Sequence, residues 1–372
     1  MDERTDHRRG RAQLTRLDQP GPRALRGADP AQGCRSRPAA RPRRGLRRGG
    51  GSSHPCPSLG RGAPPARRPG LEGQRRSRRP HPVARPVTLA VAIGKFDALH
   101  LGHRALAERA AACGRPVLLR LTGLAEAFGW PARSPLVAES DRTRVLATWP
   151  GLPEERNAPI AGLRDLPAET FVAWLAEQHG ATVLVVGADF RCGRGRSAGV
   201  VELAQLCAVQ GLRLEVVPPL LVEGAAASSS RVRQALAAAD LATASACLGR
   251  SHRLCGTVQR GDGRGRTLGF PTANLGAGDN QVPADGVYAA WAILGGQRLP
   301  AAVNIGHLPT VGGGRPLTVE AHLPGWSGDC YGQVLGLDLV ARLRPEQRFA
   351  DLTALRQGIV SDVAAVTTLL AG

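Results

Sequence analysis

Short apolar runs and helical segments alternate along residues 87–218. Each run has the length of a single strand, and the segments between the runs are long enough to hold a crossover helix. This alternation predicts right-handed crossovers and a parallel α/β sheet. The expected strands are 87–94, 117–121, 182–190 and 212–218, and the expected helices are 105–113, 168–179 and 200–210.

The pattern changes after two short helical segments within 231–248. Strand-like segments then follow one another, separated by Gly and Pro turns, which is typical of a small barrel or sandwich. A helix at about 351–370 is the last expected element, and the change of pattern places a domain boundary near 249–253. The expected strands of this second part are 286–294, 299–306, 317–323 and 333–343.

Residues 1–86 have a composition unlike that of the remaining chain. They hold 22 Arg, 13 Pro and 12 Gly, and with six acidic residues their net charge is +16, out of +19 for the whole chain. A segment so poor in large apolar side chains cannot offset its ordering entropy, so we expect disorder. It is open to three interpretations: an extension without function, including one from a start codon placed too far upstream; a polyanion-binding arm; or an organellar transit peptide.

Hydropathy and cysteine spacing exclude several classes of protein. No stretch approaches 18 uninterrupted apolar residues, and the chain opens with Asp2, Glu3, Arg4 and Asp6 rather than a basic and then apolar leader. The eight Cys form no C-x-x-C pair, as a zinc site or a disulfide framework would need. We expect neither a membrane span nor a secretory signal, and a cytoplasmic location.

The sequence GKFDALHLGH (94–103) joins the first expected strand to the first expected helix. In an α/β sheet, nucleotides bind at the carboxyl ends of the strands, where a helix N-terminus offers N–H groups to phosphate. His100 and His103 can donate to phosphate oxygens there, and Gly102 lets the backbone approach closely. The alternative is a pair of capping or solvated histidines.

Two further segments place polar groups at the same edge of the sheet. Residues 228–233, SSSRVR, precede a helix with hydroxyls and two guanidiniums, which suits the outer phosphates of a nucleotide. Residues 187–196, GADFRCGRGR, follow the third strand. The alternatives are a Ser N-cap for the first segment and a solvated loop for the second.

In the second part, residues 261–275 read GDGRGRTLGFPTANL. No G-K-[ST] follows, so this is not a Walker A sequence, but a Gly-rich loop with free N–H groups can bind phosphates in the same way. Thr272 and Asn274 lie on one face and offer oxygen ligands suited to Mg²⁺. A mobile turn that ends in a strand is the alternative.

A strand period of two in residues 317–323 puts Thr318, Glu320 and His322 on one face. A carboxylate on a barrel strand is usually solvated. A carboxylate that lies beside a substrate hydroxyl can instead orient that hydroxyl and accept its proton. Glu320 is a candidate for such a role.

In their order along residues 88–370, these motifs resemble the family of bacterial bifunctional riboflavin kinases/FMN adenylyltransferases (FAD synthetases). The resemblance implies a Rossmann-like nucleotidylyltransferase domain with a parallel sheet, followed by a small antiparallel β-barrel kinase domain with a C-terminal helix. The implied organisation is an extension at 1–86, an FMN adenylyltransferase domain at 87–249 and a riboflavin kinase domain at 250–372. The motifs that carry the resemblance are GKFDALHLGH, VGADFRCGRGR, SSSRVR, CLGR, GRTLGFPTANL, GVYA, NIG-x-x-PT, VEAHL and RPEQRF.

The implied function is FAD biosynthesis in two ATP-dependent and Mg²⁺-dependent steps. Riboflavin is phosphorylated to FMN, and an FMN phosphate oxygen then attacks the α-phosphorus of ATP and expels pyrophosphate. Because that nucleophile is already anionic, the second step needs alignment and charge neutralisation rather than a general base.

The resemblance also assigns roles to individual residues. The catalytic residues are Glu320 as base, His100 and His103. The metal ligands are Thr272 and Asn274. The flavin-binding residues are Asp189, Arg191, Gly286, Tyr288, Asn304 and Arg344. The ATP-binding and phosphate-binding residues are Gly94, Phe96, Asp97, Gly102, Ser229, Ser230, Arg231, Arg233, Gly261, Arg264, Gly265, Arg266, Gly269 and Pro271.

The chain departs from the family pattern mainly in the first domain. Ala98 stands where Gly is usual, Ser230 where Thr is usual, and residues 120–128 replace an F-x-P-x-P segment. One alternative is therefore a kinase with a degenerate nucleotidylyltransferase domain. An alternative from another class is a nucleic-acid-binding protein acting through residues 1–86, which predicts a steeply salt-dependent affinity. The expected partners are riboflavin, FMN and ATP, with no membrane, no nucleic acid and no expectation about oligomeric state.

Overall fold

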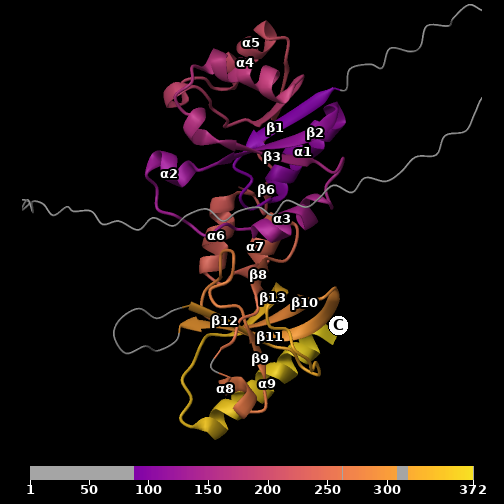
Figure 1. Ribbon diagram of the computed structural model, residues 1–372, viewed down its shortest axis with the longest axis vertical. Coiled ribbons are helices and arrows are strands. Elements are labelled where there is room, and N and C mark those ends of the chain that lie inside the picture. The colour runs from indigo at the N-terminus through magenta and orange to yellow at the C-terminus, as the bar shows by residue number, and fades with distance from the viewer. Residues whose placement is uncertain (1–87, 262, 308–316, 372) are drawn as a thin grey trace, which may run out of the picture. The chain divides into compact units, whose positions relative to one another are not determined.

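The computed structural model describes residues 88–261, 263–307 and 317–371, so the expectation for residues 1–86 lies outside it. The first part contains a five-stranded sheet of order β3-β2-β1-β4-β5, whose neighbouring strands are all parallel (Figure 1). The predicted parallel α/β sheet is thereby confirmed. Its strands are β1 (Leu89–Gly94), β2 (Arg115–Thr122), β3 (Glu154–Pro159), β4 (Val183–Gly187) and β5 (Arg213–Val217).

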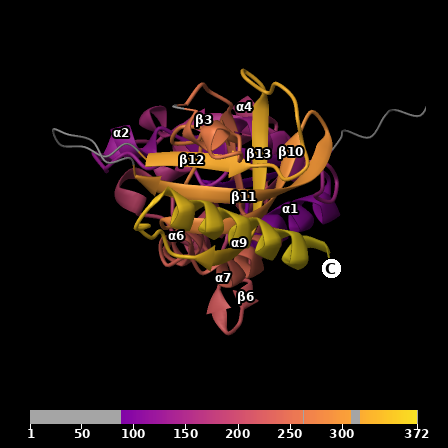
Figure 2. The ribbon, with the colours of Figure 1, turned by 90° about the horizontal axis from the view of Figure 1, so that it is seen from below.

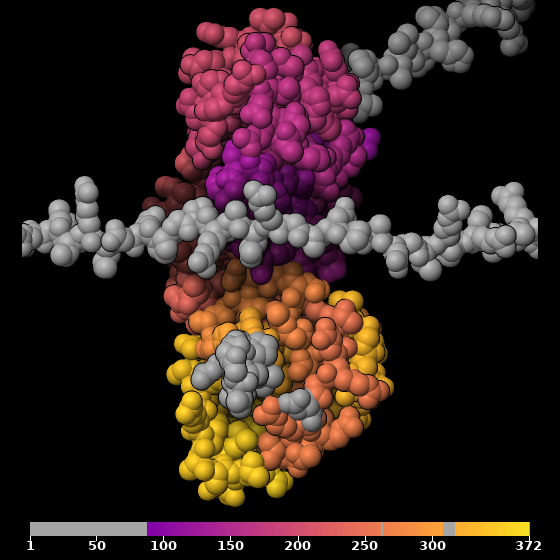
Figure 3. All heavy atoms as spheres, turned by 60° about the vertical axis from the view of Figure 1, so that its left-hand side comes forward, coloured from indigo at the N-terminus to yellow at the C-terminus, as the bar shows by residue number. Residues whose placement is uncertain are grey.

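Both faces of this sheet are covered by helices. Successive residues of β1 point to opposite faces and therefore pack into two different cores. Val91 and Ile93 belong to a core with residues of α4 (Ala168–His179) and α5 (Val200–Val209). Atoms of these helices, coloured magenta to rose, form part of the outer surface in Figure 3. Ala90 and Ala92 pack instead with the second set of helices, α1 (Leu101–Cys113) and α3 (Glu139–Leu146). The short elements α2 (Leu124–Phe128), η1 (Ile160–Gly162) and η2 (Arg194–Arg196) lie in the connections.

Helix α1 begins four residues before the predicted start at residue 105. His100 is its N-cap, and the His100 side chain accepts a hydrogen bond from the backbone N–H of His103. A capping side chain satisfies one of the free N–H groups of the first turn, so the helix can start there. His103 therefore lies within the first turn of α1 rather than before it.

Along the chain, a hairpin and a pair of helices follow the first sheet and precede the second. The hairpin strands are β6 (Leu221–Val222) and β7 (Ala225–Ala226), and the helices are α6 (Ser229–Ala237) and α7 (Leu241–Leu248). Buried residues of α6 and α7 share one apolar core with buried residues of the following sheet.

The second sheet is antiparallel, with six strands in the order β8-β13-β10-β11-β12-β9. An isolated bridge joins Gln259, just beyond β8, to Asn274 in β9, so the two edges of the sheet meet. The predicted small barrel is thus confirmed as a curled sheet. Its elements are β8 (Arg253–Thr257), α8 (Arg264–Thr267), β9 (Thr272–Asn274), β10 (Gly286–Leu294), β11 (Gln297–His307), β12 (Leu317–His322) and β13 (Val334–Arg344).

Helix α9 (Leu352–Ala371) is the predicted C-terminal helix and lies along this sheet (Figure 2). Val366 is fully buried and packs with Ala289 of β10 and Ala302 of β11. Within the described part of the chain, α9 is long and apolar enough to cross a membrane by length and composition alone. Here it packs on the curled sheet, and its Asp362 forms an ion pair with Arg344 of β13.

Candidate active site

The strand order 3-2-1-4-5 places the carboxyl ends of β1 and β4 side by side. The connections from these two strands lead to opposite faces of the sheet, and such a switch point is where α/β sheets bind nucleotides. The 94–103 segment leaves β1 here, and the 187–196 segment leaves β4. The structure therefore brings both predicted segments to one edge.

The two histidines of the 94–103 segment contact each other. Their rings are stacked with centroids 3.7 Å apart, and the ring of Phe96 meets His103 edge-on at 5.1 Å. His103 is half-buried, and its Nδ1, which is itself shielded from water, has no hydrogen-bond partner among the described residues. A Cβ at Gly102 would lie 3.1 Å from the His100 ring, which explains the glycine between the histidines.

Burial, and after it the nearby charge of Arg250, lower the pKa of His100 to about 4, and Asp97 opposes the shift. The pKa of His103 lies well below its ordinary value, first because of burial and then because His100, Arg142 and Arg250 are near. Both rings are therefore neutral at neutral pH. Each can still donate one N–H to a phosphate oxygen, without adding a positive charge.

An ion pair joins the 94–103 segment to the 228–233 segment. The Asp97 carboxylate accepts from Arg233 Nη2 at 2.7 Å and, through its other oxygen, from the backbone N–H of Leu136 at 2.9 Å. The other terminal nitrogen of Arg233, Nη1, donates to Gln281 Oε1 at 2.7 Å. The structure thus brings together two predicted ATP-binding residues that are distant in sequence.

The other polar groups of these segments have different surroundings. Ser228 caps α6, which leaves Ser229 and Ser230 in its first turn. The Arg231 guanidinium donates to the carbonyls of Val222 and Ala225, and so holds the β6–β7 hairpin rather than the region of Asp97.

In the segment after β4, the guanidinium of Arg191 is used locally. It donates to the carbonyls of Arg196 and Ser197 at 2.8 and 3.2 Å, and so braces its own loop. Asp189 lies just beyond β4, at the same edge as Gly94 at the end of β1.

A separate cavity of about 560 Å³ opens in the second part of the chain, between the Gly-rich segment, β12 and α9. Most of the kinase residues implied by the resemblance line it. They are Gly261, Arg264, Gly265, Arg266, Pro271, Thr272, Asn274, Asn304, Glu320 and Arg344.

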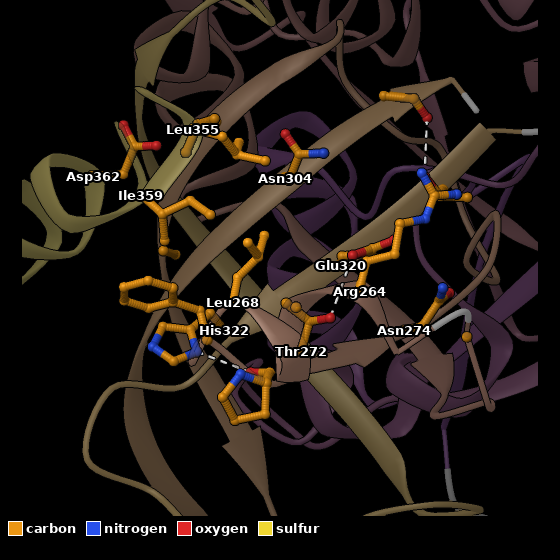
Figure 4. A pocket seen from close by; sticks show the side chains of 18 of the residues that line it. Arg264, Leu268, Thr272, Asn274, Asn304, Glu320, His322, Leu355, Ile359 and Asp362 are labelled. Atoms are coloured by element: carbon orange, nitrogen blue, oxygen red, sulfur yellow. Dashed lines mark hydrogen bonds between the residues drawn. The ribbon is translucent and has the colours of Figure 1, made fainter. Parts of the chain in front are cut away.

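One side of this cavity is polar (Figure 4). Thr272 Oγ1 donates to Glu320 Oε2 at 3.3 Å, and the strand register places Asn274 directly opposite Glu320. The Asn274 side-chain oxygen accepts from the backbone N–H of Gly276 at 2.7 Å. On the same face, His322 contacts the Pro271 carbonyl through Nδ1 at 2.9 Å. Carboxylate, hydroxyl and amide oxygens gathered in this way are ligands that suit Mg²⁺.

The other side of the cavity is apolar. Figure 4 shows Leu268 facing Leu355 and Ile359 of α9, with Asn304 near them. An apolar slot beside a few polar groups suits a flat aromatic ring that carries a polar tail.

The structure does not place every predicted kinase residue at the cavity. Gly269 and Gly286 are not part of its lining. A Cβ at Gly286 would lie 2.7 Å from the Arg344 carbonyl, so that glycine serves close packing. The Tyr288 ring is fully buried in the core, and its hydroxyl donates to the Ala284 carbonyl.

Several residues that line the cavity were not predicted from the sequence. His307, at the end of β11, is hydrogen-bonded through Nδ1 to the Asp285 carboxylate at 2.8 Å. Leu355, Ile359 and Asp362 come from α9, which sequence analysis predicted only as a closing helix. The one usable signal in the sequence was Asp362, the single acidic residue of α9, whose two carboxylate oxygens accept from Arg344 at 2.9 and 2.7 Å.

Comparison with known proteins gives two family matches. The model of riboflavin kinase matches residues 248–370, and the model of FAD synthetase matches residues 161–231. The bifunctional riboflavin kinase/FMN adenylyltransferase of Pseudomonas fluorescens is 38% identical over 288 residues, which are 75% of this chain and 92% of that protein. The protein of the same description from Escherichia coli K12 is 36% identical over 73% of this chain and 89% of its own length.

A solved structure supports the arrangement of elements. It is described as a macrolide-efflux protein from Streptococcus pneumoniae and aligns with a TM-score of 0.68 at 26% identity. The alignment covers 76% of this chain and 94% of that one. Both sheets therefore have counterparts in a single known chain.

Proposed function

Because the chain belongs to the family of bifunctional riboflavin kinases/FMN adenylyltransferases, we propose that it converts riboflavin to FMN and FMN to FAD, with ATP as the co-substrate of both steps. The observation that carries the proposal is the gathering of the kinase motifs around one cavity, with Glu320 bonded to Thr272 at its polar side. We assign residues 87–249 to adenylyl transfer and 250–372 to the kinase. We further propose a cytoplasmic enzyme whose partners are these small molecules rather than membrane or nucleic acid.

In the kinase step, the Glu320 carboxylate orients the riboflavin 5′-hydroxyl and accepts its proton. The apolar side of the cavity, with Leu268 and Ile359, holds the flavin ring, and the Gly-rich segment holds the ATP phosphates. Thr272 and Asn274 fit Mg²⁺ by their oxygen donors. When bound, the ion supplies charge neutralisation at the transferring phosphate.

In the adenylyl step, the side chains near Asp97 align two anions rather than move a proton. His100 and His103 are neutral donors, and Arg233 offers positive charge that the Asp97 pair holds in place. Since the FMN phosphate is already a nucleophile, alignment and charge stabilisation are sufficient chemistry.

Two variants of the full chain test both assignments at once. Each is incubated with ATP and Mg²⁺, and with either riboflavin or FMN, and the flavins are separated by chromatography. Glu320→Gln is expected to lose FMN formation while still converting supplied FMN to FAD. His103→Asn is expected to show the reverse, with FMN formed and FAD absent.

The result for the unsubstituted chain separates the alternatives. FAD formed from supplied FMN supports the bifunctional enzyme, whereas FMN without FAD under both conditions leaves a kinase only. Loss of both activities in either single variant would contradict two separate sites.

A further inference from the structure

The motif CLGR (247–250) has no role in the two reactions described so far, yet its arginine reaches the 94–103 segment. Arg250 Nη1 donates to the Leu99 carbonyl at 2.8 Å and to the Leu248 carbonyl at 3.1 Å, and Nη2 donates to the Ala98 carbonyl at 2.9 Å. One guanidinium therefore ties the end of α7 to the turn that carries the two histidines. The glycine before it, Gly249, lies close to α1: a Cβ there would be 2.5 Å from the Leu101 side chain at the start of that helix.

The turn that Arg250 holds has a strained backbone. Phe96 and Leu99 both have φ of 46°, in the left-handed region that side chains rarely adopt. Such conformations persist only where the surroundings fix them, and they concentrate at functional sites. Two of the three Arg250 hydrogen bonds go to the carbonyls at and beside Leu99, which is where the turn needs support.

The charge of Arg250 is not compensated by an ion pair. None of the ion pairs among the described residues involves it, and its hydrogen bonds all go to backbone carbonyls. Burial lowers the pKa of this guanidinium to about 10, so it is still charged at neutral pH. A partly buried positive charge that forms no ion pair favours the binding of an anion nearby, although the more distant carboxylates of Asp141 and Asp338 offset part of it.

We propose that Arg250 is a positioning residue of the adenylyltransferase site: it fixes the Ala98–Leu99 turn, and its partly buried charge favours the binding of the ATP triphosphate. This role rests on the proposed adenylyl transfer. It also means that a residue matched by the riboflavin kinase model, which begins at 248, serves the other reaction.

The charged groups around His100 and His103 determine how the loss of Arg250 would change the protonation of the two rings. His100 is faced by Arg250 from the end of α7 and by Asp97 from its own turn. His103 is faced by His100, by Arg142 of α3 and by Arg250. Loss of Arg250 removes a positive charge from both environments, so protonation of each ring becomes easier.

The test uses the full chain with Arg250→Met, Arg250→Lys and Arg156→Met. Arg156 of β3 is the control, because its guanidinium also donates to a backbone carbonyl, that of His179, but it is ion-paired with Glu154 and lies away from the 94–103 segment. FMN formation by each chain reports whether it is folded. FAD formation from FMN is followed against ATP concentration and pH.

For Arg250→Met we expect KM for ATP in FAD formation to rise roughly tenfold or more, which is the scale of losing hydrogen bonds from a charged group. The acid limb of the pH profile of kcat/KM should move toward neutral pH. Arg250→Lys keeps the positive charge but cannot donate to the Ala98 and Leu99 carbonyls through two nitrogens of one planar group. Its pH profile should therefore stay in place, and its KM for ATP should rise less than that of Arg250→Met. FMN formation should be unchanged in all three variants, and Arg156→Met should match the unsubstituted chain throughout.

An unchanged KM for ATP together with an unmoved pH profile in Arg250→Met overturns the proposal, even if the variant melts earlier. If Arg250→Met does not fold, Arg250→Lys decides, because wild-type KM for ATP in that variant contradicts the need for the forked hydrogen bonds. If the wild-type chain makes FMN but no FAD, the proposed adenylyl transfer itself is refuted. That result concerns the unsubstituted chain and is distinct from both outcomes for the Arg250 variants.

Discussion

The Asp97 carboxylate and the Arg233 guanidinium lie 2.7 Å apart although the two residues are 136 positions apart in the chain. Both side chains are partly shielded from water, with 27% and 18% of their surfaces exposed. The same arginine also donates to Gln281, so Asp97 and Gln281 fix it from two sides. A guanidinium held in this way is oriented before any nucleotide arrives, which lowers the entropy cost of binding phosphate.

We predict that Arg233→Met abolishes measurable FAD formation or raises KM for ATP at least about tenfold, because a charged hydrogen-bonding group is lost and Asp97 is left unpaired. FMN formation by the same chain should not change. The pairing itself is tested by a double-mutant cycle with Asp97→Asn. Non-additive losses are expected for residues in contact, and strictly additive losses would show that the pair does not act as a unit.

At the kinase cavity, the Thr272 hydroxyl has two expected tasks: it donates to Glu320, and its oxygen fits Mg²⁺. Thr272→Val keeps the shape of the side chain but removes that oxygen. We predict a fall in kcat for FMN formation of about 10²-fold or more, with a higher Mg²⁺ requirement. Thr272→Ser is the control and should stay near the unsubstituted value. Equal activity of the Val and Ser variants would place the catalytic contact elsewhere.

A substitution at Tyr288 can show whether this residue serves core packing or flavin binding. Its ring lies in the core and its hydroxyl donates to the Ala284 carbonyl. Tyr288→Phe should therefore cost about 1–3 kcal/mol of unfolding free energy, since a buried acceptor loses its donor. KM for riboflavin should not change. A raised KM with unchanged stability would restore the flavin-binding role that the family resemblance implies.

Local patterns predicted the elements whose apolar residues repeat. The strand at 286–294 is β10 with the same bounds, and the helix at 168–179 is α4. Strand β3 was missed because Glu154–Pro159 reads EERNAP, without an apolar run. It exists through tertiary contacts: it pairs with β2, and its Glu155 accepts from Arg142, which is 3% exposed. A buried arginine needs such a partner, and no local pattern shows which strand supplies it.

The same limit applies to the candidate sites. The residue types of the two phosphate-binding regions were visible in short motifs, because glycine, histidine and hydroxyl groups stand close together in the chain. The contacts between Asp97 and Arg233 and between Arg250 and Leu99 join distant segments, so they depend on the completed fold. The lining supplied by Ile359 likewise follows from where α9 packs.

His252 couples stability to pH. It is 3% exposed, its Nε2 contacts the Gln281 carbonyl at 2.7 Å, and burial lowers its pKa from 6.5 to about 4. The contact with a carbonyl means that the neutral ring carries its proton on Nε2. Between pH 6.5 and about 4 the unfolded chain binds this proton more readily than the folded chain. Unfolding free energy therefore rises with pH across this window and is lost as the pH falls.

We predict that this one histidine removes about 2 kcal/mol of unfolding free energy between pH 7 and pH 5. His252→Gln places an amide N–H near the position of Nε2 without a titrating group. The variant should lose less stability over the same range, although His100 and His103, whose pKa values are also lowered, leave part of the slope. Urea unfolding of both chains at pH 5, 6 and 7 measures how the unfolding free energy of each depends on pH. The difference between the two chains at pH 7 gives any packing cost of the substitution. Equal slopes for the two chains would mean that His252 is not the buried titrating group.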